Sequence, residues 1–136
     1  MKKFYLFLFI ALAWTISASA QVPAFPGADG YGRYTTGGRG GEVYYVTSLE
    51  DTDTPGTLRY GVTHLSKVTI LFKVSGTIQL NSSLNIRGSN ITIAGQSAPG
   101  DGICLAGYPV SVSGSNVIVR YMRFRMGDWS LSADEA

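Results

Sequence analysis

The stretch that decides the fold reads LNIRGSNITI at residues 84–93, and its pattern returns as VSVSGSNVIV at residues 110–119. Gly-Ser-Asn is identical in the two segments, and apolar residues recur at matching positions around it. A weaker copy precedes them, because VTI at residues 68–70 resembles ITI at residues 91–93 at an offset of 23. Repeats of this length built from short strands are typical of a solenoid, in which each coil buries the inner face of its neighbour.

A change of phase in the apolar pattern favours a coiled arrangement and argues against a flat sheet. Val117 and Val119 occupy odd positions, whereas the apolar residues that follow occupy even ones, namely Met122, Phe124 and Met126. One flat strand cannot bury both sets, because its side chains alternate with a period of two. A corner at residues 120–121 resolves the conflict, as in a parallel β-helix, and turns the later set inward. An ordinary β-sandwich with a coincidental repeat is the alternative.

Two local features complete the predicted fold. Asn116 is expected to stack on Asn90 at a bend, where their amides form a hydrogen-bonded ladder. One short helix is predicted over residues 55–65, with Thr54 as its cap and Pro55 at the first position. The chain is therefore predicted to be all-β, a parallel β-helix with one short helix.

The first twenty residues are typical of a secretory signal peptide. Lys2 and Lys3 precede an apolar run at residues 4–14, and Ala18-Ser19-Ala20 fits a cleavage site. A membrane anchor is the alternative, but the run is shorter than the roughly twenty residues that cross a bilayer. The mature chain is then residues 21–136. We expect it to be secreted, to the periplasm or outside the cell, and to have no membrane span.

Charge and cysteine content exclude several classes of protein. The chain has 11 Lys and Arg and 9 Asp and Glu. Without Lys2 and Lys3 the mature chain is neutral, so nucleic acid is not an expected partner. Cys104 is the single cysteine, which excludes a disulfide framework. It is predicted to be a small buried hydrophobe.

Three further motifs are interpreted structurally. The glycines at residues 27–41 precede a predicted strand and lack a Gly-Lys-Ser/Thr sequence, so they are predicted to form turns and no phosphate loop. Asp51-Thr52-Asp53 resembles the start of an EF-hand, but the twelfth loop position is Val62, where a calcium-binding Glu is required. These residues are predicted to form a solvated acidic turn. His64 is predicted to lie on the surface.

Arg123 and Arg125 are the candidate binding residues. If Met122 and Phe124 point inward, both guanidinium groups leave the same strand on its outer side, with Arg120 at the adjoining corner. Arginine binds carboxylates in a bidentate manner, so this cluster suits a carboxylate-bearing ligand. The alternative is a set of solvated charges paired with Asp128 or Asp134.

The sequence resembles pectate lyases of polysaccharide lyase family 1 over nearly all of the mature chain. The motifs that carry the resemblance are AFPGADGYG at 24–32, GGRGG at 37–41, VTSL at 46–49, PGTLR at 55–59, VSGTI at 74–78, ITIAGQSAPGDG at 91–102 and NVIVRYMRFR at 116–125. The resemblance implies the amino-terminal coils of a right-handed parallel β-helix. It also implies cleavage of polygalacturonate by β-elimination, usually with Ca²⁺.

Elimination requires removal of a proton α to the uronate carboxylate, with a base to take it and a cation to stabilise the negative charge. The resemblance to the pectate lyase family implies that the calcium-binding carboxylates and the arginine base come from later coils. Asp134 and Glu135 stand where the first calcium ligands occur and are candidate metal ligands. No residue of this chain matches the catalytic arginine, so we expect an incomplete domain that is inactive alone.

The sequence is therefore consistent with two functions. The first is a pectate lyase-like enzyme that degrades pectin, of which this chain is the opening part, acting as a monomer on pectate or a related acidic polysaccharide. The second is a secreted, non-catalytic β-solenoid that binds acidic polysaccharide.

Overall fold

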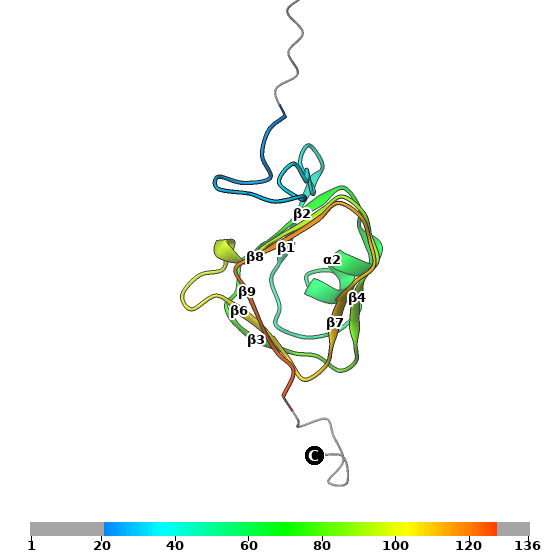
Figure 1. The fold of residues 1–136 in the computed structure, drawn as a ribbon. Coiled ribbons are helices and arrows are strands. Elements are labelled where there is room, and N and C mark those ends of the chain that lie inside the picture. The colour runs from blue at the N-terminus through cyan, green and yellow to red at the C-terminus, as the bar shows by residue number, and fades with distance from the viewer. Residues whose placement is uncertain (1–20, 128–136) are drawn as a thin grey trace, which may run out of the picture.

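The structure is a computed structural model and describes residues 21–127. The predicted signal peptide lies outside the described residues, as do Asp128, Asp134 and Glu135. Figure 1 is viewed along the axis around which the coils wind, and the successive coils overlie one another.

Short strands form three parallel sheets, one on each side of a right-handed parallel β-helix. The first sheet has the order β1-β2-β5-β8, the second β3-β6-β9 and the third β4-β7. One short helix, α2, and one 3-10 turn, η1, complete the described chain. The elements are β1 (Glu42–Val46), α2 (Leu58–His64), β2 (Val68–Phe72), β3 (Gly76–Gln79), β4 (Leu84–Ile86), β5 (Ile91–Ala94), η1 (Gly95–Ser97), β6 (Ile103–Ala106), β7 (Val110–Val112), β8 (Val117–Arg120) and β9 (Met122–Arg125).

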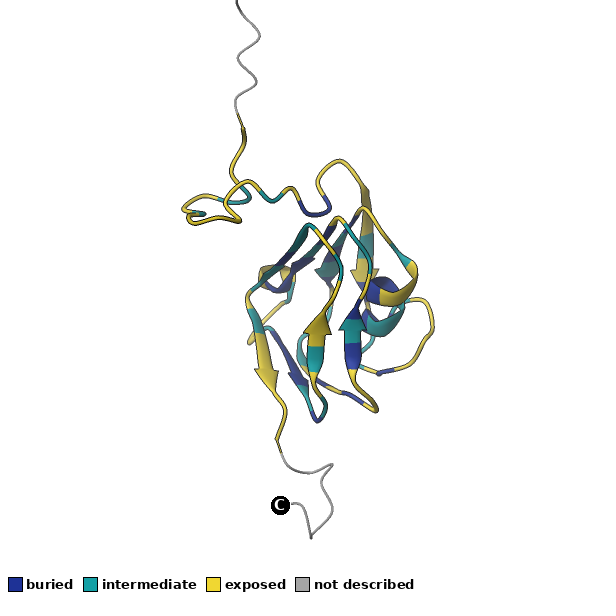
Figure 2. Ribbon diagram, turned by 45° about the vertical axis from the view of Figure 1, so that its right-hand side comes forward, coloured by how far each residue is buried: buried dark blue, intermediate teal, exposed yellow. Residues whose placement is uncertain are grey.

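The strand register confirms the repeat found in the sequence. Leu84 pairs with Val110 and Ile91 pairs with Val117, both at the offset of 26. Val68 pairs with Ile91 at the offset of 23. All of these pairs are parallel, so equivalent side chains of successive coils form columns. The inner columns supply the core, and Figure 2 shows the buried segments along the strands.

The predicted asparagine ladder is present at the corner before the first sheet. Asn116 Nδ2 donates a hydrogen bond to Asn90 Oδ1. Both residues have left-handed backbone, with φ of 57° and 59°, which asparagine tolerates better than most residues. Ser89 and Ser115 add a second rung through their hydroxyl groups, 3.0 Å apart.

The predicted corner between Val119 and Met122 is also present. Tyr121 separates β8 from β9 with a φ of 55°. In β9, Met122 and Phe124 align with the buried residues Ile103 and Leu105. Phe124 is nevertheless 52% exposed and Met126 is 55% exposed, because no described coil covers this end of the stack. The sequence correctly predicted that Met122 and Phe124 align with inward-facing residues, but it did not predict that Phe124 and Met126 are exposed.

The helix is shorter than predicted. It begins at Leu58 and not at Pro55, and its N-cap is Thr57, whose hydroxyl accepts from the backbone N–H of Tyr60. Gly56 has a φ of +96°, a left-handed value that no α-helix contains, so helix cannot form before Thr57. Leu58 and Val62 are buried, as expected.

The glycine-rich segment before β1 lies against the outer face of the first sheet. Gly38 donates a backbone hydrogen bond to Thr92 Oγ1. A Cβ on Gly38 would lie 2.1 Å from the carbonyl oxygen of Val68, and one on Gly41 would lie 1.6 Å from that of Lys67. These glycines therefore permit close packing of backbone on backbone, and Ile118, on the outer face, is buried beneath the segment.

Candidate functional site

The outer face of the second sheet presents two columns of side chains, which we call the arginine face. One column runs from Thr77 through Cys104 to Arg123. The other, in the same strand order, consists of Gln79, Ala106 and Arg125. Small residues occupy the central strand, where Cys104 is buried, with polar side chains on the strand to one side and the two arginines on the strand to the other.

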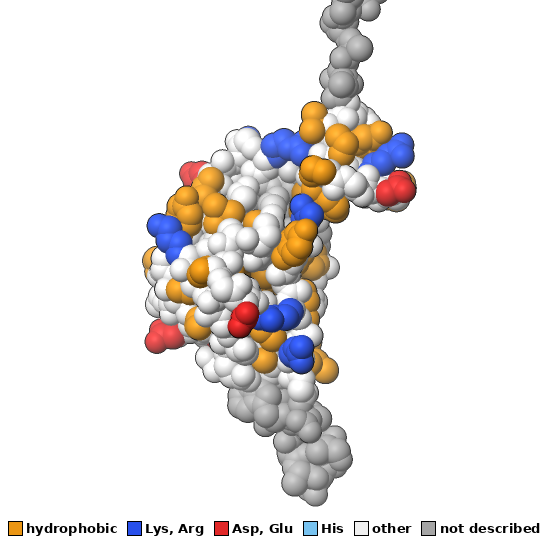
Figure 3. Space-filling model, turned by 90° about the vertical axis from the view of Figure 1, so that its left-hand side faces the viewer, with side chains coloured by type: hydrophobic (Ala, Val, Ile, Leu, Met, Phe, Trp, Pro, Cys, Tyr) orange, Lys and Arg blue, Asp and Glu red, His pale blue; other side chains and the backbone are white. Residues whose placement is uncertain are grey.

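Arg123 and Arg125 are both exposed. Within residues 21–127 neither makes an ion pair or a side-chain hydrogen bond. Two residues along a strand are roughly 7 Å apart, so each guanidinium group can bind a separate carboxylate. Figure 3 shows the side of the molecule that carries basic side chains next to hydrophobic ones, with acidic side chains scattered among them. The sequence-based alternative, pairing with Asp128 or Asp134, falls outside the described residues.

Arg120 does not join the other two arginines. It ends β8 in the first sheet, on the other side of the corner from β9. Its guanidinium carbon lies 3.9 Å from the centroid of the Phe25 ring and 5.0 Å from that of Tyr121. These cation–π contacts hold it against the amino-terminal segment. The predicted cluster of three cations is therefore reduced to Arg123 and Arg125.

A buried ion pair joins α2 to the loop before it, and no motif in the sequence predicted this pair. Arg59 Nε donates to Asp51 Oδ1 at 2.8 Å, and Arg59 Nη2 donates to Asp51 Oδ2 at 2.7 Å. The backbone N–H of Asn81 also donates to Asp51 Oδ2, at 2.7 Å. Asp51 was predicted to be solvated, but it is only 8% exposed. Asp51 therefore joins the loop before α2 to the helix through Arg59, and to the chain that follows β3 through Asn81.

Tyr44 supports the same region. Its hydroxyl donates to the carbonyl of Thr57 at 3.0 Å and accepts from the N–H of Gly56 at 2.6 Å. Burial raises the pKa of the Tyr44 hydroxyl above its usual value, and the nearby Tyr60 acts in the same direction. The hydrogen bond from Gly56 opposes this shift. Tyr44 is therefore a neutral structural group, and we assign it no chemical role.

The remaining single-residue predictions are confirmed. Cys104 is 5% exposed, and its thiol hydrogen-bonds to the carbonyl of Leu105. His64 is half exposed and lies 2.9 Å from both carboxylate oxygens of Asp53. No three His, Cys, Asp or Glu side chains converge anywhere in residues 21–127. The described residues therefore do not assemble the carboxylate cluster that a calcium site requires.

Several known proteins are similar in sequence to this chain. The protein named probable pectate lyase C of Aspergillus fumigatus is 41% identical over 130 residues, which are 95% of this chain and 30% of that protein. Its namesake from Emericella nidulans is 43% identical over 119 residues, 87% of this chain and 28% of the relative. The chain is pectate lyase-like. Pectate lyase 1 of Hesperocyparis arizonica is 46% identical over 72 residues, 51% of this chain and 19% of the relative.

A solved structure supports the fold of this pectate lyase-like chain. The crystal structure of jun a 1, the major allergen from cedar pollen, superposes with a TM-score of 0.52 and 32% identity. The match covers 70% of this chain and 28% of that one. No protein-family model matches the chain.

The pectate lyase-like chain spans about 30% of the length of the fungal relatives. None of the helices in residues 21–127 has the length and apolar character needed to cross a bilayer.

Proposed function

We propose that this chain provides the opening coils of a secreted, pectin-degrading lyase, which cleaves polygalacturonate by β-elimination. The similarity to proteins named pectate lyase over most of the chain carries the proposal. Similarity to pectate lyases also implies dependence on Ca²⁺, for which Asp134 and Glu135 are this chain's proposed ligands. The chain is proposed to act as a monomer, and residues 1–20 are proposed to be the removed signal peptide.

Arg123 and Arg125 have a defined role in this proposal. Polygalacturonate carries a carboxylate on every sugar, and the two guanidinium groups have no partner within the described residues. A charge-assisted, bidentate contact to each carboxylate would bind and orient the polymer along the arginine face. None of the described residues is proposed as the base that removes the proton. The 136-residue chain alone is therefore proposed to bind the polymer without cleaving it.

Binding can be tested by electrophoresis of the chain, secreted from its full precursor, through gels that contain polygalacturonate. We expect the polymer to retard the chain, and Arg123→Ala/Arg125→Ala to weaken binding by about tenfold or more, since hydrogen bonds to charged groups contribute about 1.5 to 3 kcal/mol each. Arg33→Ala/Lys73→Ala is a matched control, because it removes two positive charges elsewhere. Equal weakening by both double variants would show a nonspecific charge effect.

Lyase activity is tested separately, by the ultraviolet absorbance of the unsaturated product with and without Ca²⁺. We expect no product from this chain alone, and calcium-dependent turnover by it would contradict the placement of the catalytic residues elsewhere.

A non-catalytic polysaccharide-binding solenoid is the second candidate, favoured by the same unpartnered arginines. The coding DNA beyond the codon for Ala136 separates the two. A continuing frame with clustered acidic residues and a later arginine supports the lyase, whereas an immediate stop codon supports the binding protein.

A further inference from the structure

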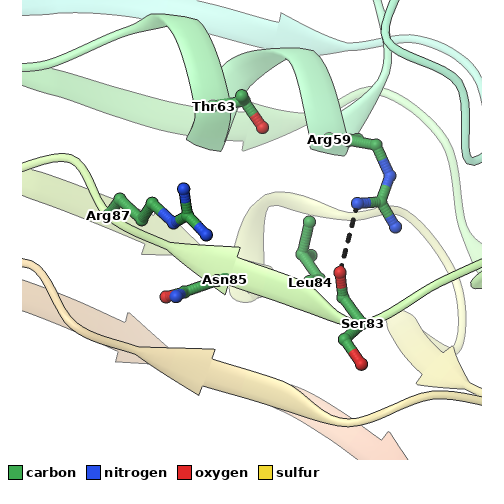
Figure 4. Close-up of a pocket in the computed structure, with 6 residues that line it drawn as sticks. All are labelled: Arg59, Thr63, Ser83, Leu84, Asn85 and Arg87. Atoms are coloured by element: carbon green, nitrogen blue, oxygen red, sulfur yellow. Dashed lines mark hydrogen bonds between the residues drawn. The ribbon is translucent and has the colours of Figure 1, made fainter.

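A hollow of about 190 Å³ lies between helix α2 and strand β4. Its lining is Arg59, Thr63, Ser83, Leu84, Asn85 and Arg87 (Figure 4). Because β4 belongs to the β4-β7 sheet, the hollow is on a different side of the solenoid from the arginine face (Figure 1).

Arg87 is the unpartnered cation of this hollow. It is exposed, and it makes no hydrogen bond or ion pair with any residue in the range 21–127. Its guanidinium group extends into the gap between β4 and the helix, on the side where Thr63 points down from α2 (Figure 4). The Thr63 hydroxyl likewise has no partner among the described residues.

Arg59 supplies a further donor from the other end of the hollow. Asp51 occupies its Nε and Nη2 atoms, which leaves Nη1 with one contact, to the carbonyl of Ser83 at 3.4 Å. That contact is longer than an ordinary N–H···O hydrogen bond, so Nη1 retains donor capacity. Asp51 neutralises the charge of Arg59 but prevents its guanidinium group from moving away. Since no acidic residue lines the hollow, its net charge is set by Arg87.

We propose that this hollow binds one oxyanion group of a small molecule, with Arg87 as the principal ligand. Thr63 Oγ1 and Arg59 Nη1 then donate to neighbouring oxygens of the same molecule. The volume is below the roughly 300 to 1,000 Å³ of pockets for drug-sized ligands, which fits a single sugar acid or an inorganic ion. A carboxylate and a phosphate share this chemistry, because both match the planar fork of a guanidinium group. The inference uses no residue of the arginine face and does not depend on the proposed function.

The test is calorimetric titration of the secreted chain with galacturonic acid, inorganic phosphate and galactose, each separately. We expect at least one of the two anions to bind and galactose, which lacks the carboxylate, to show no binding. Binding of galacturonic acid alone assigns the site to sugar acids, and binding of phosphate alone assigns it to inorganic anions. Failure of both anions to bind, or equal binding of galactose, overturns the proposal.

Substitutions of single arginines test whether the anion binds in the hollow. Arg87→Gln replaces the guanidinium group by a shorter, uncharged amide, and it should weaken anion binding about tenfold or more without changing the midpoint of thermal unfolding. Arg33→Gln is the control for charge, because Arg33 lies outside the hollow. Arg123→Gln should weaken binding to polygalacturonate but retain the anion binding that Arg87→Gln removes, so the two proposals can fail separately. Unchanged binding by Arg87→Gln would contradict the inference.

Discussion

The two ends of the solenoid differ in what covers their interior. At the first coil, α2 packs against β1 and β4, and its residues Leu58 and Val62 are at most 2% exposed. At the last described coil the inward positions are open. The column Ile78, Leu105 and Phe124 illustrates the change, since the exposed fraction is 1%, 3% and 52% along it. A coil's own sequence therefore directs a side chain inward, but the neighbouring coil or cap buries it.

The covered end also contains a group of side-chain hydrogen bonds that connect separate segments of the chain. Asp51, Arg59 and Asn81 form one hydrogen-bonded group there, and Tyr44 bonds to the turn that precedes the helix. Stability should therefore respond more strongly to substitutions at the covered end than to those at the open end.

The largest effect is expected from Asp51→Ala. Removing one partner of a buried ion pair leaves the other uncompensated, so the free energy of unfolding should fall by about 3 to 5 kcal/mol. Urea unfolding followed by circular dichroism measures this loss. Asp53→Ala is the matched control, because Asp53 forms an exposed pair with His64 and should cost only about 0 to 1 kcal/mol. Equal losses in the two variants would refute a special role for the buried pair.

Leu58→Ala should have the next largest effect. The side chain is 2% exposed, and truncation of a buried leucine costs about 2 to 5 kcal/mol, depending on how far the cavity collapses. The same unfolding experiment applies. A loss below that of an exposed-site variant would show that the helix does not cover the core in solution.

Tyr44→Phe should reduce stability by about 1 to 2 kcal/mol near neutral pH, because Gly56 N–H and Thr57 C=O lose their side-chain partner. It should also change the pH dependence. Since the pKa of Tyr44 is raised in the folded state, the unfolded chain loses this proton first, and stability falls as the pH rises above 10. The variant should lack this part of the alkaline loss. Unfolding midpoints at neutral and alkaline pH, compared with those of Tyr60→Phe, provide the check.

Phe124→Ala should have the smallest effect, below about 1 kcal/mol, because half of the ring is already in water. Leu105→Ala, one coil earlier in the same column, should cost about 2 to 5 kcal/mol. The ratio of the two losses measures how far burial decays toward the open end. Similar losses would mean that Phe124 is covered in solution.

The sequence predicted the repeating part of the fold well. The pairing of Ile91 with Val117 and the Asn90–Asn116 ladder followed from residues that recur at a fixed offset. The phase change between Val119 and Met122 located the corner for the same reason. Each of these predictions rested on a spacing along the chain, because stacking of the coils brings residues one repeat apart into contact.

Features that depend on single, distant contacts could not be predicted in this way. Asp51 lies thirty residues from Asn81, with which it bonds, and nothing in the repeat relates the two positions. Thr54 and Pro55 form a good helix start locally, but the left-handed Gly56 moved the start to Leu58. The hollow beside Arg87 arises from docking of a helix that occurs once, so its donors had no counterpart in another coil. Asp134 and Glu135 remain predictions, since they lie outside the described residues.

The corners of the coils differ in how freely their length varies. The connections 87–90 and 113–116, which carry the asparagine ladder, have equal lengths. The connections from the first sheet to the second are 73–75, 95–102 and the single residue Tyr121, yet the strands after them remain in register. This corner thus tolerates insertion and deletion while the opposite one keeps the coils aligned. Evolution, or a protein engineer, can graft new loops there without altering the scaffold.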